Sequence, residues 1–395
     1  MFGWEFPPFK SGGLGTACFG LTKSLAKEGV EVIFVIPKAP KKIKGDHVDL
    51  LIGNYLGGKF STIRVDTLLT PYLDAEQYHN ARKNAPGGST YGSNLMEEVR
   101  RYADIAEEIA KTHDFDVIHA HDWLSTYAGI RAKEVSGKPL VIQIHATEFD
   151  RTGGNPNPVV REIEQMAVNS ADIIVPVSNY TRKIICDKYN CDPNKAITVH
   201  NGIDFSENQE ISFDGVKQDE KVVLYLGRVT IQKGPEFFID VAKKVLDYDT
   251  EVKFIFVGDG DMLPTCIERA ASLGITKNIV FAGFLRGKDV DKAYRMSDVY
   301  IMPSVSEPFG LTPLEAMRND VPVIISKTSG VSEVIEHCFK ADFWDVDEMA
   351  NQVLGLLNYS VLKRTMKKYG NDEAHSLSWD GPARKLIEIY KSMVK

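Results

Sequence analysis

Short apolar runs alternate with amphipathic stretches along almost the whole of this chain. The apolar runs end in Gly, Pro, Asn or charged residues, as buried strands do. The stretches between them repeat apolar residues every three or four positions, which is typical of helices packed on a sheet. This alternation predicts an α/β fold with parallel sheets covered by helices on both faces. The predicted strands are 30–36, 117–123, 139–145, 171–178 and 196–200 in the first half, and 221–227, 253–257, 279–281, 299–302 and 321–325 in the second.

Two domains are predicted, because 395 residues exceed what one ordinary core accommodates. The polar and weakly periodic segment 205–220 is interpreted as a linker. It separates a first domain, residues 1–204, from a second domain, residues 221–378. Residues 379–395 contain a further amphipathic helix.

The first half also contains a stretch with little pattern. Met1–Trp4 is a short apolar piece that fits the end of a first strand, and Tyr91–Lys111 has the periodicity of a long amphipathic helix. Between them, residues 37–86 are rich in Gly, Pro and Lys. We interpret that stretch as irregular, with a strand near Thr62–Val65.

Composition narrows the class of protein. Hydrophobic residues make up 43% and charged residues 26%, as in globular proteins. A net charge of -7 argues against a nucleic-acid partner, which would favour a basic face. The five cysteines lack CxxC spacing, so they indicate reduced thiols in a cytoplasmic protein and give no zinc signature. No apolar run reaches the length of a membrane span and no signal peptide is recognised, so no transmembrane segment is expected.

The segment 303–317, PSVSEPFGLTPLEAM, carries the strongest chemical signal. It follows a buried strand, passes through a loop and restarts as a helix, with Thr312 as the expected N-cap and Pro313 as the first helical residue. The backbone N–H groups around this start, including those of Phe309, Gly310 and Leu311, favour an anion together with the helix dipole.

Two carboxylates, Glu307 and Glu315, flank that positive helix start. Carboxylates repel phosphate, so we expect them to bind hydroxyl groups of a sugar or a ribose. The alternative for Glu315 is structural, because Thr312-Pro-Leu-Glu315 fits a capping box in which the glutamate accepts from the Thr312 N–H. Glu307, between a strand end and a proline, has no routine structural task.

Two cations follow the first strand of the second domain. Arg228 and Lys233 lie in the loop between Gly227 and a helix that begins at Pro235. Such a pair suits a diphosphate. The planar guanidinium of Arg donates two parallel hydrogen bonds to phosphate oxygens, and the ammonium of Lys acts as a point charge. A simple exposed basic loop is the alternative.

A glycine pair near the start of the chain gives a weaker signal. Gly12 and Gly13 lie between a strand and a helix, where backbone N–H groups cradle phosphate and a ligand can approach the main chain closely. The alternative is a tight turn without a ligand, which is the more frequent explanation of such a pair. The dinucleotide pattern GxGxxG is absent, and Lys10 beside the pair is either a ligand contact or a solvated lysine.

Polar residues end two strands of the first half. His121, Asp122 and His145 are expected at carboxyl ends of parallel strands, where ligands of open α/β sheets collect. Metal binding is disfavoured, because these residues come from different strands and fit no metal motif. Asp122 alternatively caps the helix near Trp123, and His119 is best interpreted as a core histidine.

Glu307 and Glu315, separated by seven residues within SEPFGLTPLEAM, resemble the E-x7-E signature of retaining glycosyltransferases with two facing Rossmann-like domains, the GT-B fold. The chain is most similar to family-4 glycosyltransferases and to the related glycogen and starch synthases. The K-S-G-G-L run from Lys10, the G-R-x4-K-G pattern from Gly227 and the N-G-I-D turn from Asn201 extend the resemblance over the chain.

The resemblance implies roles for the candidate residues. It places Arg228 and Lys233 at the donor diphosphate, and Gly12 and Gly13 near the phosphate or the reacting sugar. It further implies that residues 379–395 cross back onto the first domain. Other roles that it implies are contact with the transferred sugar for Glu307 and His145, with the ribose for Glu315, with the donor for Phe309, Gly310, Leu311, Thr312 and Leu285, and an acceptor-side position for Asp122 and Lys10.

The function expected from the resemblance is retaining transfer of a sugar, with glucosyl favoured, from a nucleotide-sugar to a carbohydrate acceptor such as an α-glucan. UDP- or ADP-glucose is the favoured donor, and no cofactor or metal is expected because cations and dipoles stabilise the leaving group. The alternatives are a family-4 transferase acting on an envelope glycan, glycolipid or small glycoside, a non-catalytic glycan- or nucleotide-binding protein, and a nucleotide-sugar epimerase.

Overall fold

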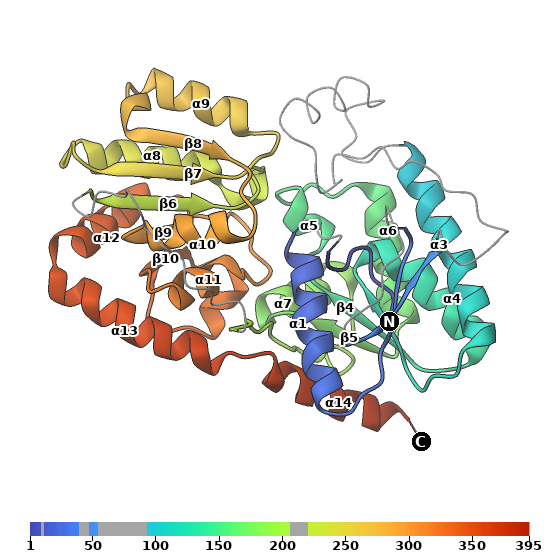
Figure 1. Cartoon of the computed structure of the whole chain (residues 1–395). Coiled ribbons are helices and arrows are strands. Elements are labelled where there is room, and N and C mark those ends of the chain that lie inside the picture. The colour runs from blue at the N-terminus through green and yellow to red at the C-terminus, as the bar shows by residue number, and fades with distance from the viewer. Residues whose placement is uncertain (9–11, 39–46, 54–92, 206–219, 395) are drawn as a thin grey trace. The chain divides into compact units, whose positions relative to one another are not determined.

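A computed structural model describes residues 1–8, 12–38, 47–53, 93–205 and 220–394 of the chain (Figure 1). The chain divides into two compact units. Unit 1 comprises Met1–Phe149, Gly154–Gly202 and Trp379–Lys395, and unit 2 comprises Asp150–Gly153 and Ile203–Ser378. Among the described residues, none of the helices combines the length and the apolar character that a bilayer span needs.

Unit 1 is built on parallel strands. Its strands are β1 (Ile33–Ile36), β2 (Asp49–Ile52), β3 (Ile118–His121), β4 (Leu140–Ile144) and β5 (Ile173–Pro176). β1 pairs with β2, β3 with β4, and β4 with β5. Phe2 joins the two groups through bridges to Val35 of β1 and Ala120 of β3. The winding of the chain therefore reverses between the Phe2 segment and β3, which is the switch point of this sheet.

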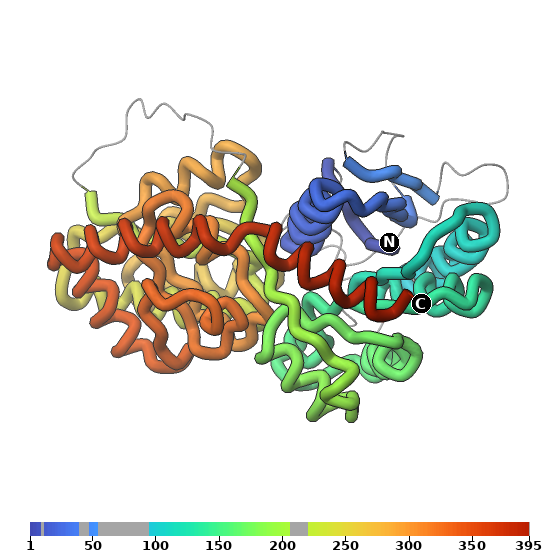
Figure 2. The backbone as a smooth tube through the Cα atoms, turned by 90° about the horizontal axis from the view of Figure 1, so that it is seen from below, coloured from blue at the N-terminus to red at the C-terminus, as the bar shows by residue number. Residues whose placement is uncertain are grey.

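Helices of unit 1 cover this sheet, and the last of them comes from the end of the chain. α14 (Asp380–Met393) packs against α1 (Gly13–Lys27), as Figures 1 and 2 show. The Ser24 hydroxyl donates to Asp380 at 2.9 Å, and a Cβ at Gly20 would lie 2.1 Å from the Trp379 ring. The other helices are α3 (Ser93–Thr112), η3 (Trp123–Ser125), α4 (Thr126–Ser136), α5 (Glu148–Arg151), which ends within unit 2, α6 (Pro158–Ser170) and α7 (Asn179–Tyr189).

Unit 2 has one six-stranded parallel sheet in the order β11-β10-β9-β6-β7-β8. The strands are β6 (Val222–Leu226), β7 (Lys253–Val257), β8 (Ile279–Gly283), β9 (Val299–Met302), β10 (Val323–Ser326) and β11 (Phe339–Ala341). If β6 is counted as the first strand and the sheet is followed from β8 to β11, the strand order is 3-2-1-4-5-6. This is the order of a dinucleotide-binding Rossmann sheet. Its switch point lies between β6 and β9, which pair directly.

The core of unit 2 forms between this sheet and its helices. Phe238 of α8 packs edge-on against Phe254 of β7, and Tyr225 of β6 stacks on Phe256 of β7 with ring centroids 4.5 Å apart. All four rings are buried, and such rings remove a large apolar area from water. The helices are η4 (Ile231–Lys233), α8 (Pro235–Leu246), α9 (Leu263–Ser272), η5 (Thr276–Asn278), α10 (Lys288–Arg295), α11 (Thr312–Arg318), η6 (Gly330–Glu333), α12 (Val346–Asn358) and α13 (Ser360–Ser376).

The predicted fold class is confirmed, whereas several element predictions were wrong. β2 lies within the stretch interpreted as irregular, and the predicted strand at 62–65 lies outside the described residues. The strand β11, which follows the short η6, was not predicted. Residues 196–200 form a single bridge to β5 instead of a strand. Short edge segments carry too few residues for their periodicity to be recognised.

Candidate active site

The switch point of unit 2 brings together two loops far apart in sequence. The Arg228 loop (residues 227–234) follows β6, and the Glu307 loop (residues 303–311) follows β9. The backbone carbonyl of Gln232 accepts from the N–H groups of Val305 at 3.0 Å and Ser306 at 3.3 Å. Gly234 has a φ of 59°, and a Cβ there would lie 2.1 Å from the carbonyl oxygen of Pro303. Only glycine permits this close packing of the two loops.

An ion pair joins the two loops. The Lys233 ammonium contacts the Glu307 carboxylate directly, and the side chains are 20% and 7% exposed. The Ser304 hydroxyl also donates to Glu307, at 3.4 Å. Backbone bonds from Glu307 to the Thr328 carbonyl, 2.9 Å, and from Gly330 to the Glu307 carbonyl, 2.9 Å, fix the loop beside β10. Sequence patterns marked both residues but gave no sign that they pair.

Arg228 lies exposed on the same loop as Lys233. Its guanidinium donates to the side chain of Gln232 at 3.4 Å, and Gln232 is itself buried. Arg228, Lys233 and Glu307 are therefore carried by the two loops that meet at the switch point. Sequence reasoning missed Gln232, whose polar side chain in a short loop carries no distinctive signal.

The helix α11 begins differently from the prediction. Leu311 is the N-cap, Thr312 and Pro313 are the first helical residues, and no side chain caps the start. The Thr312 hydroxyl accepts from the phenol of Tyr300 at 2.7 Å. Glu315 accepts from the phenol of Tyr294 at 3.0 Å, so the structure shows no capping box between Thr312 and Glu315.

Both tyrosines are fully buried, and burial raises the pKa of each phenol well above its usual value. They therefore act as neutral donors that orient Thr312 and Glu315. Sequence reasoning missed them, because an aromatic residue on a strand or helix is usually a core residue.

Two further loops reach the same edge of the sheet. A Cβ at Gly258, where φ is 141°, would lie 1.8 Å from the carbonyl oxygen of Gly227. The Val229 N–H donates to the Asp259 carbonyl at 2.9 Å, and the Gly258 N–H donates to the Gly283 carbonyl at 2.9 Å. Leu285 follows β8 in the loop before α10 and is half-buried. Phe309 and Gly310 are buried in the Glu307 loop.

In unit 1 the corresponding edge carries Asp122. This residue has a φ of 58°, which is uncommon for a residue other than glycine and concentrates at functional sites. Its carboxylate accepts from the backbone N–H groups of His145 at 2.7 Å and Ala146 at 3.4 Å. It makes no side-chain cap to η3, so the capping alternative is wrong. Asp122 instead fixes the loop that presents His145.

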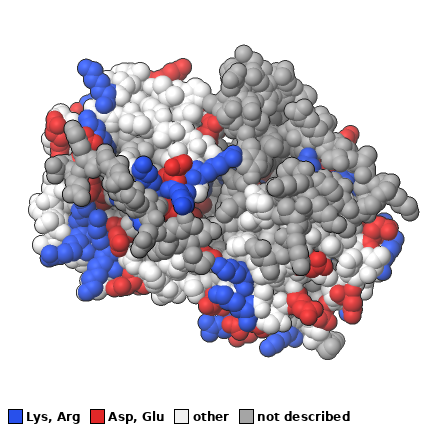
Figure 3. Space-filling model, in the orientation of Figure 1, with Lys and Arg blue, Asp and Glu red and all other residues white. Residues whose placement is uncertain are grey.

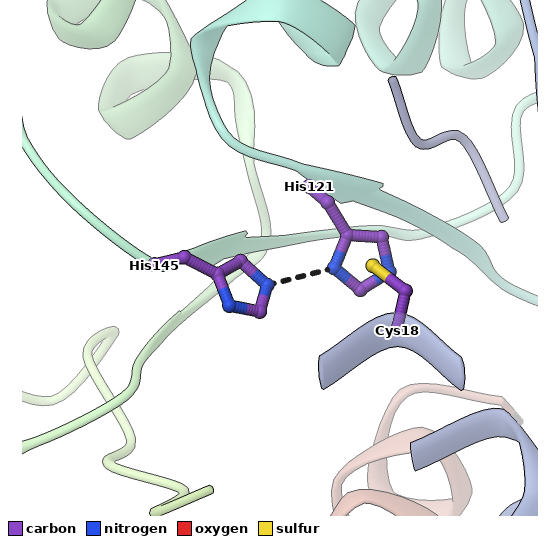
Figure 4. Close-up of side chains that lie close together, drawn as sticks. All are labelled: Cys18, His121 and His145. Carbon is purple, nitrogen blue, oxygen red and sulfur yellow. Dashed lines mark hydrogen bonds between the residues drawn. The ribbon is translucent and has the colours of Figure 1, made fainter. Parts of the chain in front are cut away.

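The two histidines of β3 and His145, which follows β4, form a connected group, of which Figure 4 shows His121 and His145. The His121 Nδ1 lies 3.1 Å from the His145 Nε2, and His121 is fully buried whereas His145 is half-buried. Burial lowers the pKa of His121 well below its usual value, and that of His119 to about 3. His119 lies 2.6 Å from the phenol of Tyr390 and stacks on His121, as a core histidine does.

The glycine pair opens α1. Gly13 is its first residue and Gly12 its N-cap, and both are exposed. Within the described residues no atom lies within 4 Å of a Cβ built at either position. The buried Glu5 carboxylate accepts from the N–H of Gly15 at 2.8 Å, a contact that sequence reasoning missed. Lys10 lies outside the described residues.

The two Rossmann-like units, each with polar loops at the switch point of a parallel sheet, define the GT-B fold. The sequence model of glycosyl transferases group 1 matches residues 207–373, and that of glycosyltransferase family 4 matches residues 11–207. The chain belongs to the group 1 glycosyltransferases, as the family resemblance predicted.

The chain is similar to relatives along most of its length. An uncharacterized glycosyltransferase of Methanocaldococcus jannaschii is 29% identical, over 99% of this chain and 97% of that protein. A D-inositol 3-phosphate glycosyltransferase of Salinispora arenicola is 30% identical, over 73% of this chain and 71% of that protein.

Solved structures share the fold. Sucrose-phosphate synthase of Thermosynechococcus elongatus superposes with a TM-score of 0.76 at 18% identity, covering 99% of this chain and 97% of that one. HepE of Anabaena, solved with UDP and glucose, has a TM-score of 0.70 at 17% identity, covering 99% and 98%.

Proposed function

We propose that this chain is a metal-independent, retaining hexosyltransferase that moves a glucosyl unit from a nucleotide-diphosphate sugar to a hydroxylated acceptor. The observation that carries the proposal is the Lys233–Glu307 pair at the switch point of unit 2. In this pair, Lys233 supplies a positive charge for a diphosphate, and Glu307 supplies a carboxylate that accepts from sugar hydroxyls. UDP-glucose is the favoured donor, supported by the complex of HepE with UDP and glucose.

Catalysis in this proposal rests on electrostatic stabilisation of the leaving group. As the glycosidic bond breaks, negative charge grows on the diphosphate. Lys233, Arg228 and the start of α11 stabilise that charge, so the transfer needs no metal. Activity that persists after exhaustive chelation with EDTA is the expected result, and loss of activity that Mg²⁺ or Mn²⁺ restores would contradict this part of the proposal.

Glu307 accepts hydrogen bonds from the hydroxyls of the sugar, and Glu315 accepts those of the ribose. His145 positions the transferred sugar, while Asp122 holds the His145 backbone in place. Gly12 and Gly13 leave room for the donor to approach the main chain at the start of α1. The acceptor hydroxyl attacks from the face that the diphosphate leaves and passes its proton to the departing phosphate oxygen, which retains the configuration at the anomeric carbon.

Replacing Glu307 tests the site. Glu307→Ala is expected to reduce transfer by at least about a thousandfold, equivalent to about 4 kcal/mol of transition-state stabilisation. Released nucleoside diphosphate gives the rate, and circular dichroism checks the fold. The exposed Glu336→Ala in the same unit is the control and should retain normal turnover. A Glu307→Ala variant with near-normal turnover would remove the site assignment.

The acceptor has two candidates. An α-glucan follows from the resemblance to glycogen synthases, and a small polyol or glycoside follows from the relative that is a D-inositol 3-phosphate glycosyltransferase. Incubation of the protein with UDP-, ADP- and GDP-sugars and either glycogen or inositol 3-phosphate separates them. Formation of a new sugar nucleotide without acceptor would indicate an epimerase, and donor binding without product a non-catalytic protein.

We also place this activity in the cytoplasm. All five cysteines are free thiols, and four of them are buried. Reduced thiols are typical of proteins in reducing compartments. On the face of the molecule drawn in Figure 3, Lys and Arg lie interspersed with Asp and Glu over the described part, which supports a small-molecule donor over a nucleic acid.

A further inference from the structure

Three side chains that could bind a soft metal ion meet in unit 1, and one of them is His145, the residue proposed to position the sugar. They are Cys18 of α1, His121 at the end of β3 and His145 just after β4 (Figure 4). Their potential ligand atoms all lie within 4.8 Å of one another. The three residues come from three separate elements, so no spacing in the sequence indicates the group.

The distances fit the coordination of a tetrahedral ion. Zinc binds histidine nitrogen at about 2.0–2.1 Å and thiolate sulfur at about 2.3 Å, so two nitrogens on one ion lie about 3.3 Å apart and a nitrogen and a sulfur about 3.6 Å apart. The observed separation between the His121 Nδ1 and the His145 Nε2 is 3.1 Å. Small side-chain rotations would therefore bring the three ligands to bonding distance.

His121 also carries a buried ring nitrogen without a partner among the described residues. His121 is fully buried, and among the described residues its Nε2 has no hydrogen-bond partner. A buried ring nitrogen without a partner costs free energy, and such atoms often mark an ion or water that belongs at the site. An ion bound at the Nδ1 of His121, the nitrogen that faces His145, would leave the ring proton on Nε2 and so fix the tautomer of this histidine.

The surroundings favour a cation. Cys18 is fully buried, and burial, Glu5 and Asp122 together raise the pKa of its thiol. The two carboxylates disfavour a thiolate by itself, but the same negative charge would stabilise a divalent cation. Binding of that cation would release the thiol proton. His145 is half-buried, so an ion can reach the group from its side.

We propose that Cys18, His121 and His145 form an inhibitory site for a borderline-soft divalent cation, Zn²⁺ in particular. One thiolate and two imidazoles select such an ion over Mg²⁺ or Ca²⁺, which prefer oxygen ligands. Three protein ligands leave a fourth position for water. The bound ion occupies the imidazole of His145, so the ring no longer contacts the sugar and transfer slows. The inhibition rests on the proposed role of His145, whereas the binding does not.

Spectroscopic titration with Co²⁺ tests the binding without any transferase assay. The wild-type protein is expected to bind one equivalent of Co²⁺ with a thiolate-to-cobalt charge-transfer band, which Zn²⁺ then abolishes by competition. Cys18→Ala should lose this band, and Cys186→Ser, which changes a half-buried thiol elsewhere in unit 1, should retain it. A wild-type protein without the band, or a band that persists in Cys18→Ala, would overturn the proposal.

Thermal unfolding and activity complete the test. Zn²⁺ should raise the unfolding temperature of the wild type but not of Cys18→Ala, whose midpoint without metal also reports whether it folds. His121→Gln should likewise lose the Zn²⁺-induced shift. In the transfer assay, Zn²⁺ should inhibit Cys18→Ala at least about tenfold less potently than the wild type, the lower end of the effects that follow loss of groups around a metal. If the band appears but no donor is turned over, the site stands and the proposed function fails.

Discussion

The two units use the same sheet topology but place different chemistry at the switch point. In unit 2, Lys233 and Glu307 bring opposite charges together, with Arg228 on the same loop. In unit 1, the corresponding edge carries histidines whose buried member, His121, has a lowered pKa, and an aspartate that accepts backbone N–H groups. The comparison teaches that the cationic side chains proposed to bind a diphosphate lie in unit 2, while the edge of unit 1 carries the imidazole proposed to position the sugar.

Within this comparison, the largest effects are expected from variants that remove one of the two roles at a time. Lys233→Met should lower kcat by about a hundredfold to a thousandfold, as loss of one charge-stabilising donor does, and should weaken binding of UDP at least tenfold. His145→Ala should lower kcat by about a hundredfold, the lower range for a group that assists at the reacting centre, with unchanged affinity for UDP. Calorimetric titration with UDP and steady-state kinetics measure both.

Lys243→Met is the matched control for Lys233→Met, because it removes an exposed lysine–carboxylate pair on α8. Exposed pairs contribute little, so its stability should change by less than about 1 kcal/mol, with normal kinetics. Equal loss of UDP affinity in the Lys233 and His145 variants would show that the two units do not divide the roles in this way.

The next effect concerns glycines and stability. Gly234→Ala introduces a side chain at positive φ and a Cβ 2.1 Å from a backbone oxygen, so it should reduce the free energy of unfolding by about 3 kcal/mol. Gly12→Ala meets no described atom and should change stability by less than about 0.5 kcal/mol. Chemical denaturation measures both values.

Gly12→Ala should nevertheless raise the KM for the donor if the ligand approaches the main chain there. A Gly12→Ala variant as unstable as Gly234→Ala would mean that the glycine is required by the fold. The pair thus separates a glycine needed for packing from one proposed to make room for a ligand.

The smallest effect concerns pH. His119 has a pKa of about 3 in the folded protein because of its burial, compared with about 6.5 when unfolded. The unfolded chain therefore binds more protons between these values, and the stability from neutral His119 is complete above pH 6.5 and is lost as pH falls toward 3. The lowered pKa of His121 likewise makes the folded protein less stable as the pH falls.

Unit 1 should therefore respond to acid before unit 2. The fluorescence of Trp123 and Trp379, both buried in unit 1, reports its unfolding, and Trp344→Phe removes the exposed tryptophan of unit 2. His119→Phe should reduce the decline of stability between pH 6.5 and 4. A variant with the same pH dependence as the wild type would exclude His119 as its source.

Much of the fold could be predicted because it is encoded locally. The strand β7 occupies the predicted residues, Lys253–Val257, and the helix α3, Ser93–Thr112, ends one residue after the predicted helix Tyr91–Lys111. A buried parallel strand must be an apolar run, and a helix on a sheet must repeat apolar residues at its own period, so both are visible within a window of a few residues. Pro235 likewise marked the first residue of α8.

The sequence by itself determined the alternation of strands and helices, the loops that carry the candidate residues and the membership of the family. Only the tertiary structure decided which loops meet. The order of the strands places β6 beside β9, which lets Lys233 contact Glu307 across 74 positions of sequence. The same is true of Cys18 beside His121 and His145, and of Tyr294 beside Glu315. Side-chain pairing depends on distance in space, and sequence patterns record only neighbours along the chain.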